Sequence, residues 1–298
     1  MNYYEEIKNE LINNEITKKV KDYSKNKNDL MTYYNVGKII IDAQGGEERA
    51  KYGDGLIKEY SKRLSIELNK SYSTRNLKYM RKYYLFQKGQ PVVAQLTWSH
   101  YIQLLSFSND KINYYINEVI KNRLSKRQLQ EKIKNKEYER LPKETKLKLI
   151  NSNEKEEIQD YIKNPIIINN PNNLDNISEK ILQKLILEDI PYFLSQLGDS
   201  YSFIKNEYKI SDGIINQFID LLLFNIKYNC YVVVELKTTK LLSSHVGQIL
   251  VYMNYIDKNI KSNNHDNTIG IIVSRIENKF VIDYSTDPRI KTTTYVLV

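Results

Sequence analysis

Cysteine is almost absent from this chain of 298 residues, in which Cys230 is the only one. One thiol cannot form a disulfide within the chain or build a Cys-rich zinc site. A chain without disulfides is expected in a reducing, cytoplasmic setting. Long apolar runs are also absent, since no stretch approaches the ~20 apolar residues that span a bilayer. The first ten residues are polar and carry acids, so we expect neither a membrane span nor a signal peptide.

Positive charge is concentrated in the first half of the chain. Residues 1–150 contain 30 Lys and Arg against 18 Asp and Glu, a net charge of +12, whereas residues 151–298 contain 15 against 18, a net charge of −3. This asymmetry suggests a polyanion partner, such as nucleic acid, bound mainly by the first half. A solubilising surface in a Lys-rich chain is the alternative interpretation.

Apolar residues at helical spacing predict a series of helices in the first half. We expect them at about 4–24, 29–43, 55–68, 74–87, 98–107, 110–123 and 125–138. Residues 92–96 are predicted to form a short strand or wing. A polar stretch with weak periodicity and two prolines then predicts a linker at 146–176, which leaves 1–145 as the first domain.

The helix expected at 74–87 follows Ser73, a good N-cap residue, and has two distinct faces. Leu77, Met80 and Tyr84 share one face, which can pack. Three basic residues, Arg75, Lys78 and Lys82, lie on another face, and Arg81 lies beside them. A helix, a short turn and a second helix with a basic face resemble helix-turn-helix geometry, so we expect these four side chains to contact DNA phosphates. An ordinary solvated face is equally compatible with the pattern.

From residue 177 onward the pattern changes to short strand-like runs around one helix. A striped helix at 178–197 should break near Pro191, and a second helix is expected at about 245–258. Strands are predicted at 201–204, 206–210, 217–225, 230–236, 269–274, 279–284 and 294–298. Residues 177–298 are therefore predicted to form an α/β or α+β sheet domain.

Three charged residues stand inside the apolar strands of this second domain. Asp220 lies within QFIDLLLF, and Glu235 and Lys237 lie within YVVVELK. Charges in apolar strands are costly unless they are paired or bind a metal. Two carboxylates on neighbouring strands can share a divalent ion, and Lys237, two residues from Glu235, projects from the same face. The lysine could then orient or deprotonate an attacking water, or stabilise charge on a phosphate.

The helix that follows these strands carries Gln248 and Tyr252, four residues apart on one face. This spacing after E-x-K resembles the helix that flanks the site in RecB-like nucleases, where Gln248 could bind a metal-bound water or the DNA backbone. Simple packing of the helix on the sheet explains the pair equally well.

An additional acid is the least certain part of the predicted site. Glu188 and Asp189, in the helix before the first strand, are candidates, and Glu207 has a similar claim. A solvated helix face accounts for Glu188 at least as well.

Longer segments make the chain similar to the YhcG family of bacterial PD-(D/E)xK nuclease proteins. The similarity covers nearly the whole chain. In the second half it rests on FIDLLLFNIKYNCYVVVELK, GQILVYMNYID and TIGIIVS. In the first half it rests on YYNVGKIIIDAQ, YGDGLIKEYSKRL, STRNLKYMRKYYLF and QLTWSHYIQLL. The resemblance departs from the family pattern at Gln183, where a Glu is expected near the start of the helix before the site.

The resemblance implies a helical, winged-helix-like first domain joined to a restriction-endonuclease-like domain with a mixed central sheet. It implies that Asp220, Glu235, Lys237 and Gln248 hold the catalytic positions. Mg²⁺ or Mn²⁺ would be bound by Asp220, Glu235 and the Leu236 carbonyl, with Glu188 as the further candidate. The expected activity is cleavage of DNA, with a homodimer as a plausible assembly because cutting both strands needs two active centres.

Three rival functions are compatible with the same residues. The chain could be a DNA-binding protein that keeps the nuclease fold without cutting, or a nuclease directed at RNA. The first domain could also be a module for protein interaction or dimerisation instead of DNA binding.

Overall fold

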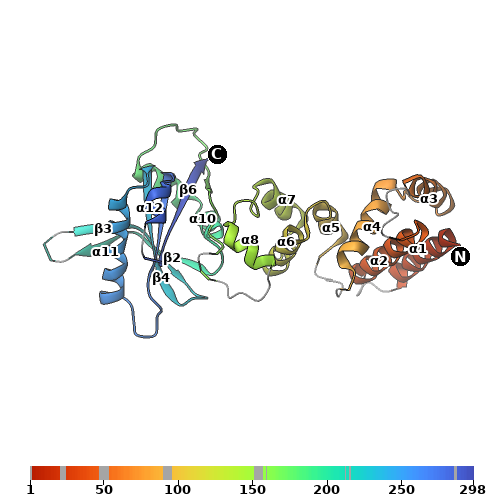
Figure 1. Cartoon of the computed structure of the whole chain (residues 1–298), viewed down its shortest axis with the longest axis horizontal. Coiled ribbons are helices and arrows are strands. Elements are labelled where there is room, and N and C mark those ends of the chain that lie inside the picture. The colour runs from red at the N-terminus through yellow and green to blue at the C-terminus, as the bar shows by residue number, and fades with distance from the viewer. Residues whose placement is uncertain are drawn as a thin grey trace. The chain divides into compact units, whose positions relative to one another are not determined.

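The structure is a computed structural model and divides the chain into two compact units, Met1–Tyr138 and Glu139–Val298 (Figure 1). The described residues are 2–20, 25–46, 54–89, 96–150, 157–158, 160–211, 213–214, 216–284 and 287–298. None of the helices described there is both long enough and apolar enough to cross a membrane.

The first unit is helical, as predicted. Its helices are α1 (Tyr3–Val20), α2 (Lys25–Ala43), α3 (Asp54–Glu67), α4 (Thr74–Gln87), α5 (Trp98–Leu104), α6 (Asn109–Asn122) and α7 (Lys126–Lys134). The strand or wing predicted at 92–96 lies outside the described residues, apart from the buried Leu96.

Close packing of α2 against α4 organises the first unit. Leu77, Met80 and Tyr84 of α4 are buried, as the apolar face predicted. Gly37 of α2 permits the contact, because a Cβ at this position would lie 2.2 Å from the Met80 carbonyl oxygen. The basic face of α4 is thereby left outward, with Arg75 and Lys82 exposed.

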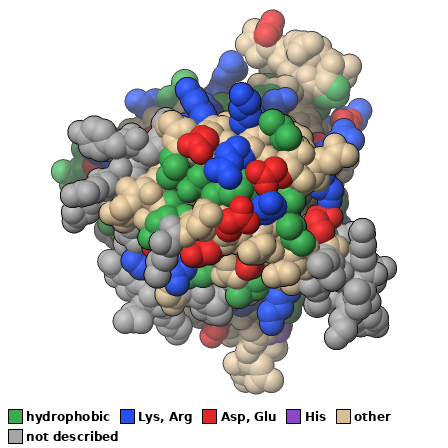
Figure 2. Space-filling view, turned by 90° about the vertical axis from the view of Figure 1, so that its right-hand side faces the viewer, with side chains coloured by type: hydrophobic (Ala, Val, Ile, Leu, Met, Phe, Trp, Pro, Cys, Tyr) green, Lys and Arg blue, Asp and Glu red, His purple; other side chains and the backbone are tan. Residues whose placement is uncertain are grey.

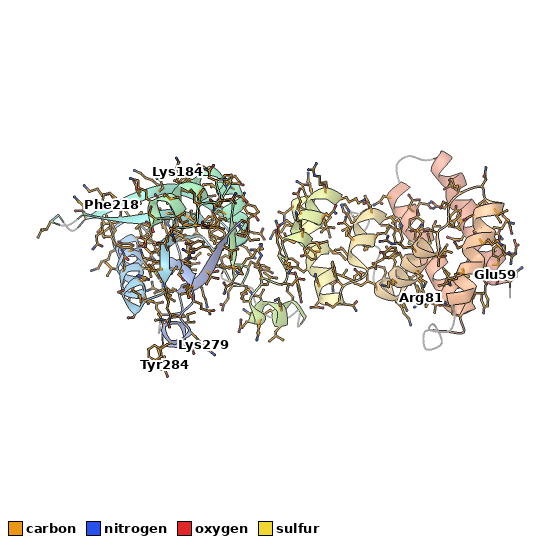
Figure 3. The ribbon with its side chains drawn as sticks, turned by 90° about the horizontal axis from the view of Figure 1, so that it is seen from above. Glu59, Arg81, Lys184, Phe218, Lys279 and Tyr284 are labelled. Carbon is orange, nitrogen blue, oxygen red and sulfur yellow. The ribbon has the colours of Figure 1, made fainter. Side chains whose placement is uncertain are left out.

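The surface of the first unit carries ion pairs as well as the predicted basic residues. Lys8 of α1 and Glu67 of α3 are 2.5 Å apart, and Arg63 lies 3.5 Å from Glu59. On the face in Figure 2, basic and acidic side chains alternate around an apolar patch instead of separating by sign. Figure 3 labels Glu59 on α3 and Arg81 on α4.

The second unit is built around a six-stranded mixed sheet in the order β1-β6-β5-β4-β3-β2. β2, β3 and β4 are antiparallel, whereas β4, β5, β6 and β1 run parallel. The strands are β1 (Ile166–Ile168), β2 (Tyr201–Ser211), β3 (Asn216–Asn225), β4 (Cys230–Lys240), β5 (Ile269–Ile276) and β6 (Ile290–Leu297). The helices are α8 (Lys143–Ile150), α9 (Glu179–Glu188), α10 (Ile190–Leu197), α11 (Ser243–Asn259) and α12 (Lys279–Asp283). The predicted fold class, a helical first part and a mixed sheet, is confirmed.

The segment 146–176 is not the linker that we predicted. It belongs to the second compact unit and supplies β1, which pairs with β6 through Ile166 and Tyr295. The Thr293 hydroxyl also donates to the Lys163 carbonyl oxygen at 2.8 Å. A three-residue strand shows no periodicity, and its partner lies about 130 residues away, so the local sequence could not reveal it.

Residues 279–283 form the helix α12, whereas the sequence pattern predicted a strand at 279–284. Val281 and Ile282 pack against the core between the sheet and α11, and Phe280 points to solvent. A short apolar run fits the spacing of a helix and that of a strand equally well. Only the packing of its inward-facing residues decides between the two.

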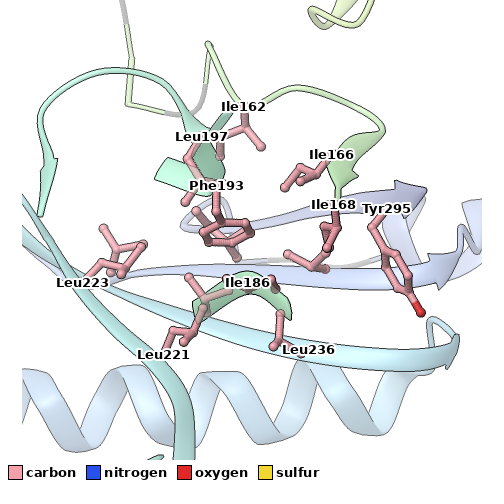
Figure 4. Close-up of a cluster of buried hydrophobic side chains, with 14 of the residues drawn as sticks. Ile162, Ile166, Ile168, Ile186, Phe193, Leu197, Leu221, Leu223, Leu236 and Tyr295 are labelled. Atoms are coloured by element: carbon pink, nitrogen blue, oxygen red, sulfur yellow. The ribbon is translucent and has the colours of Figure 1, made fainter. Parts of the chain in front are cut away.

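Helices cover both faces of the sheet, and neighbouring residues of β4 point to opposite sides. Val232, Val234 and Leu236 pack under α9 and α10, in the core shown in Figure 4. Val233 packs under α11 on the other face, with Ile249 and Met253. Since side chains alternate along a strand, Glu235 and Lys237 share the face of Val233.

Candidate active site

The candidate site forms where β3 and β4 separate. Their pairing runs from Asn225 and Cys230 to Leu221 and Val234, and Asp220 and Glu235 follow immediately. Asp220 Oδ2 accepts a hydrogen bond from the Leu236 backbone N–H at 2.7 Å. A hydrogen bond from a side chain therefore replaces the backbone hydrogen bonds between β3 and β4 at this point. It holds the Asp220 carboxylate against β4, the strand that carries Glu235 and Lys237.

Glu235 and Lys237 form a buried pair on β4. Their exposed fractions are 2% and 8%, and Lys237 Nζ donates to Glu235 Oε1 at 2.8 Å. The structure thus brings together Asp220, Glu235 and Lys237, the three residues selected from the sequence.

Glu179 joins this group, although the sequence analysis did not select it. It lies in the first turn of α9, after the Ser178 N-cap, and its Oε2 is 3.4 Å from Lys237 Nζ. Gln183, one turn later on the same helix face, donates to the Asp220 backbone carbonyl at 2.9 Å. The family resemblance led us to expect a Glu at position 183, where this chain has Gln. The carboxylate near the start of this helix is instead that of Glu179, four residues earlier. An acidic residue directly after an N-cap was the available signal.

The structure does not bring Glu188 into the group. It is the last residue of α9 and is exposed. It follows Glu179 by nine residues, or roughly 13 Å at 1.5 Å per residue. Asp189 has a structural role, since its side chain accepts from Tyr192 N–H and caps α10.

Glu207 is exposed on β2, between residues that pair with the two neighbours of Asp220. Its backbone has a φ of 46° within a strand, a conformation that is uncommon for a residue other than glycine. Its charge helps to raise the pKa of Asp220.

Gln248 and Tyr252 flank the group from α11. Gln248 Nε2 donates to the Tyr252 hydroxyl at 2.8 Å, so the two side chains share a face as predicted. Burial raises the pKa of Tyr252, with a smaller opposing effect from Gln248. His245 accepts from the Leu242 N–H at the start of α11.

The carboxylates are held in an environment that disfavours their charge. Burial raises the pKa of Asp220, although the Leu236 N–H and Lys237 oppose the effect. Burial, with the nearby Asp220 charge, raises the pKa of Glu235 to about 7. Burial lowers the pKa of Lys237, but the hydrogen bond and charge of Glu235 outweigh it and leave that pKa above its ordinary value. The site therefore favours an additional cation.

The donor atoms present fit a hard divalent cation. Glu235 Oε2 is buried without a hydrogen-bond partner, which is costly unless another ligand satisfies it. The Leu236 carbonyl points to the same side of β4 as its N–H, and therefore toward Asp220. Oxygen donors of this kind suit Mg²⁺ or Mn²⁺. Among the described residues, no cluster of three or more His, Cys, Asp or Glu could hold a metal, so these two carboxylates would need ligands from water or substrate.

The predicted DNA-contacting residues lie on α4 in the first unit. Arg75 and Lys82 are exposed, whereas Lys78 and Arg81 are half-buried. Arg75 donates to the Tyr79 hydroxyl at 3.2 Å, and Arg81 donates to Gln44 Oε1 at 3.3 Å. The four side chains therefore differ in how freely they can reach a phosphate.

Comparison with known proteins confirms the resemblance drawn from the sequence. Residues 8–140 match the DUF1016 N-terminal domain, and residues 159–297 match the YhcG PDDEXK nuclease domain. A relative from Escherichia coli (strain K12), described as "Putative nuclease YhcG", is 28% identical over 81% of this chain and 75% of its own length.

Two solved structures also resemble part of the chain. A repair endonuclease from Pyrococcus abyssi is 18% identical, with a TM-score of 0.29 over 42% of this chain and 48% of that one. The EndoMS-dsDNA2 complex is 17% identical, with a TM-score of 0.30 over 43% of this chain and 48% of that one. The matched region spans about half of each solved chain.

Proposed function

Since this chain carries a DUF1016 N-terminal domain followed by a YhcG PDDEXK nuclease domain, we propose that it is a metal-dependent nuclease that hydrolyses DNA phosphodiester bonds. The observation that carries the proposal is the group formed by the half-buried Asp220 and the buried Glu235 and Lys237, with Glu235 Oε2 lacking a partner. A structural role would not require one buried and one half-buried carboxylate to lie together where β3 and β4 separate.

In this mechanism Asp220, Glu235 and the Leu236 carbonyl would hold a Mg²⁺ or Mn²⁺ ion, which would supply Lewis-acid stabilisation of charge on the phosphate. Lys237 has three N–H donors. One reaches Glu235 at 2.8 Å and another lies toward Glu179 at 3.4 Å. The third is available for a water or a phosphate oxygen, so Lys237 orients the attacking water and stabilises the developing charge. Gln248, hydrogen-bonded to Tyr252, lies beside the same sheet face and can contact the water or the backbone.

DNA is the proposed partner of both units. The first unit would contribute phosphate contacts from Arg75, Lys78, Arg81 and Lys82 on α4. A homodimer would supply the two active centres that cutting both strands of a duplex requires.

Cleavage of supercoiled plasmid DNA with Mg²⁺ or Mn²⁺ tests the proposal. Lys237→Ala should reduce the cleavage rate by about 100-fold or more, because a donor aimed at developing charge contributes on that scale. Lys184→Ala, an exposed lysine on α9 that Figure 3 labels, is the matched control and should cleave like the wild type.

Full cleavage by Lys237→Ala would contradict the assignment. Competition among duplex DNA, single-stranded DNA and structured RNA in the same assay separates a DNA-directed nuclease from an RNA-directed one. Metal binding measured by calorimetry and lost in Asp220→Ala separates a working site from a scaffold that does not cut.

A further inference from the structure

An exposed aromatic pair lies at α12, outside the candidate site: Phe280 belongs to the helix and Tyr284 is its C-cap residue. Phe280 and Tyr284 are 71% and 72% exposed, although large aromatic side chains usually contribute to cores. They are four residues apart and therefore lie on one side of the helix. Their ring centroids are 4.7 Å apart, with 37° between the planes, which is a favourable spacing for two aromatic rings.

The rings face outward because the opposite side of α12 is anchored. Val281 and Ile282 pack against the core on the α11 side of the sheet. Asn278, the N-cap of α12, donates from Nδ2 to the Leu241 carbonyl at 3.0 Å. Figure 3 shows Lys279 and Tyr284 projecting from an edge of the second unit. These rings cannot turn inward without breaking that anchor.

The position of α12 connects the aromatic pair with the candidate site. β5 pairs in parallel with β4, and Ser274 of β5 lies opposite Lys237. Asn278 follows four residues later, which is at most roughly 13 Å along an extended chain. Successive phosphates of one strand in a B-form duplex are about 3.4 Å apart along the axis. A nucleic-acid strand in the site would therefore reach α12 within a few nucleotides.

The chemistry around the rings fits a nucleic-acid strand. Exposed Lys279 precedes Phe280 on α12, and exposed Lys240 precedes Leu241, whose carbonyl accepts from Asn278, while exposed Glu277 and Asp283 lie nearby in the chain. Aromatic faces beside cations are the usual platform for unpaired bases, whose phosphates meet the cations. Two aromatic side chains cover at most about 500 Å², below the roughly 800 Å² per partner of a stable protein interface. A second copy of this chain is therefore a poorer occupant than a base.

We propose that Phe280 and Tyr284 form a stacking platform for unpaired bases of the strand that occupies the active site. This inference rests on the proposed nuclease function and narrows its substrate. DNA with an unpaired or frayed segment beside the cleaved bond is bound in preference to a continuous duplex, because paired bases keep their faces inside the stack.

Equilibrium binding of the full chain in EDTA, which prevents metal-dependent cleavage, tests the platform. The probes are a fluorescein-labelled single-stranded oligonucleotide and a blunt duplex of the same sequence, followed by anisotropy. The double substitution Phe280→Leu with Tyr284→Leu keeps apolar side chains but removes the aromatic faces. It should weaken single-strand binding about 5-fold or more, because stacking of one base contributes on that scale, and it should lower the ratio of single-strand to duplex affinity.

Two further variants control the test. Ile226→Ser changes another exposed apolar residue, 65% exposed in the turn between β3 and β4 at the opposite end of β4, and should bind like the wild type. Phe280→Tyr keeps an aromatic face and should retain single-strand affinity within about 2-fold, and circular dichroism shows whether each variant is folded. Single-strand binding by the double variant within 2-fold of the wild type overturns the platform. The same holds if only its sedimentation behaviour changes, because the rings would then serve a protein contact.

Failure of this inference can be distinguished from failure of the nuclease proposal. The platform is judged from binding without metal, whereas the nuclease proposal is judged from plasmid cleavage by Lys237→Ala. Either result can be negative while the other stands.

Discussion

At the scale of single residues, the candidate site keeps charged groups buried or half-buried by giving each a specific partner. Asp220 accepts from the Leu236 N–H, and Lys237 donates to Glu235. The exception is Glu235 Oε2, which has no hydrogen-bond partner among the described residues. One unsatisfied carboxylate oxygen beside a second carboxylate is the strongest local reason to expect a cation here.

The raised pKa of Glu235 predicts a stability that depends on pH. Its pKa is about 7 in the folded protein, above its ordinary value of 4.5. The folded protein then binds the proton more tightly than the unfolded chain, so this stabilisation is complete below pH 4.5 and is lost as the pH rises through 7. In EDTA, Glu235→Gln should remove that loss. From pH 5 to pH 8, the free energy of unfolding of the wild type should therefore fall by about 1–3 kcal/mol more than that of the variant.

Urea denaturation at several pH values measures this effect. Glu188→Gln is the control, since Glu188 is exposed at the end of α9 and its variant should follow the wild type throughout. Parallel pH profiles for the wild type and Glu235→Gln would show that Glu235 is not protonated in the folded protein.

Glu179 is predicted to position Lys237. Its carboxylate lies 3.4 Å from Lys237 Nζ, and partners that orient a functional side chain are commonly worth 10–100-fold in activity. Glu179→Gln should therefore slow metal-dependent cleavage by about 10-fold and shift its pH profile, because one negative charge beside Lys237 is removed. Glu188→Gln, on the same helix, should change neither quantity. Equal effects of both substitutions would show that the total charge of α9 matters, and not the placement of Lys237 by Glu179.

At the scale of secondary-structure elements, the break between α9 and α10 directs side chains to the site. Asp189 ends α9 and caps α10, and Pro191 stands in the first turn of α10, where its missing N–H costs little. The predicted break at Pro191 is confirmed. The first two turns of α9 then point Glu179 and Gln183 toward the site, while Phe193 of α10 packs in the core.

The contact between α2 and α4 gives a prediction for the first unit. Gly37→Ala places a Cβ 2.2 Å from the Met80 carbonyl oxygen, and the helices must separate to admit it. We expect the free energy of unfolding to fall by about 1–3 kcal/mol, the usual cost of overpacking. Thermal melting followed by circular dichroism measures the change.

Gly55→Ala is the matched control, because a Cβ at Gly55 in α3 meets nothing within 4 Å. This variant should melt at or above the wild-type temperature, since alanine favours a helix over glycine. Equal destabilisation by both substitutions would contradict the close approach of α2 and α4.

At the scale of the whole molecule, charge is divided along the chain. Residues 1–150 carry a net charge of +12 and residues 151–298 a net charge of −3. The proposed division of labour follows from this asymmetry, with binding mainly in the first unit and chemistry in the second. Ion pairs such as that of Lys8 and Glu67 consume part of the positive charge, so the exposed face of α4 is a more specific candidate than the net charge alone.

Salt dependence of DNA binding tests the role of α4. Each phosphate contact adds about 0.9 to the slope of log affinity against log salt concentration. Arg75→Ala with Lys82→Ala should therefore weaken binding at low salt and reduce that slope by about 1.8. Lys58→Ala with Lys62→Ala removes two exposed charges from α3 and should leave the slope unchanged. If both double variants changed the slope equally, DNA binding would depend on the overall positive charge of the first unit and not on α4.

The sequence by itself determined the elements and residues that depend on local patterns. Charged residues inside two apolar strands were enough to select Asp220, Glu235 and Lys237, and helical spacing selected the buried face of α4. Only the tertiary structure decided which acid joins them, because the direction of α9 depends on its packing and on the break at Asp189. It also assigned β1 to the sheet and 279–283 to a helix, since a short apolar run acquires its conformation from the surface against which it packs.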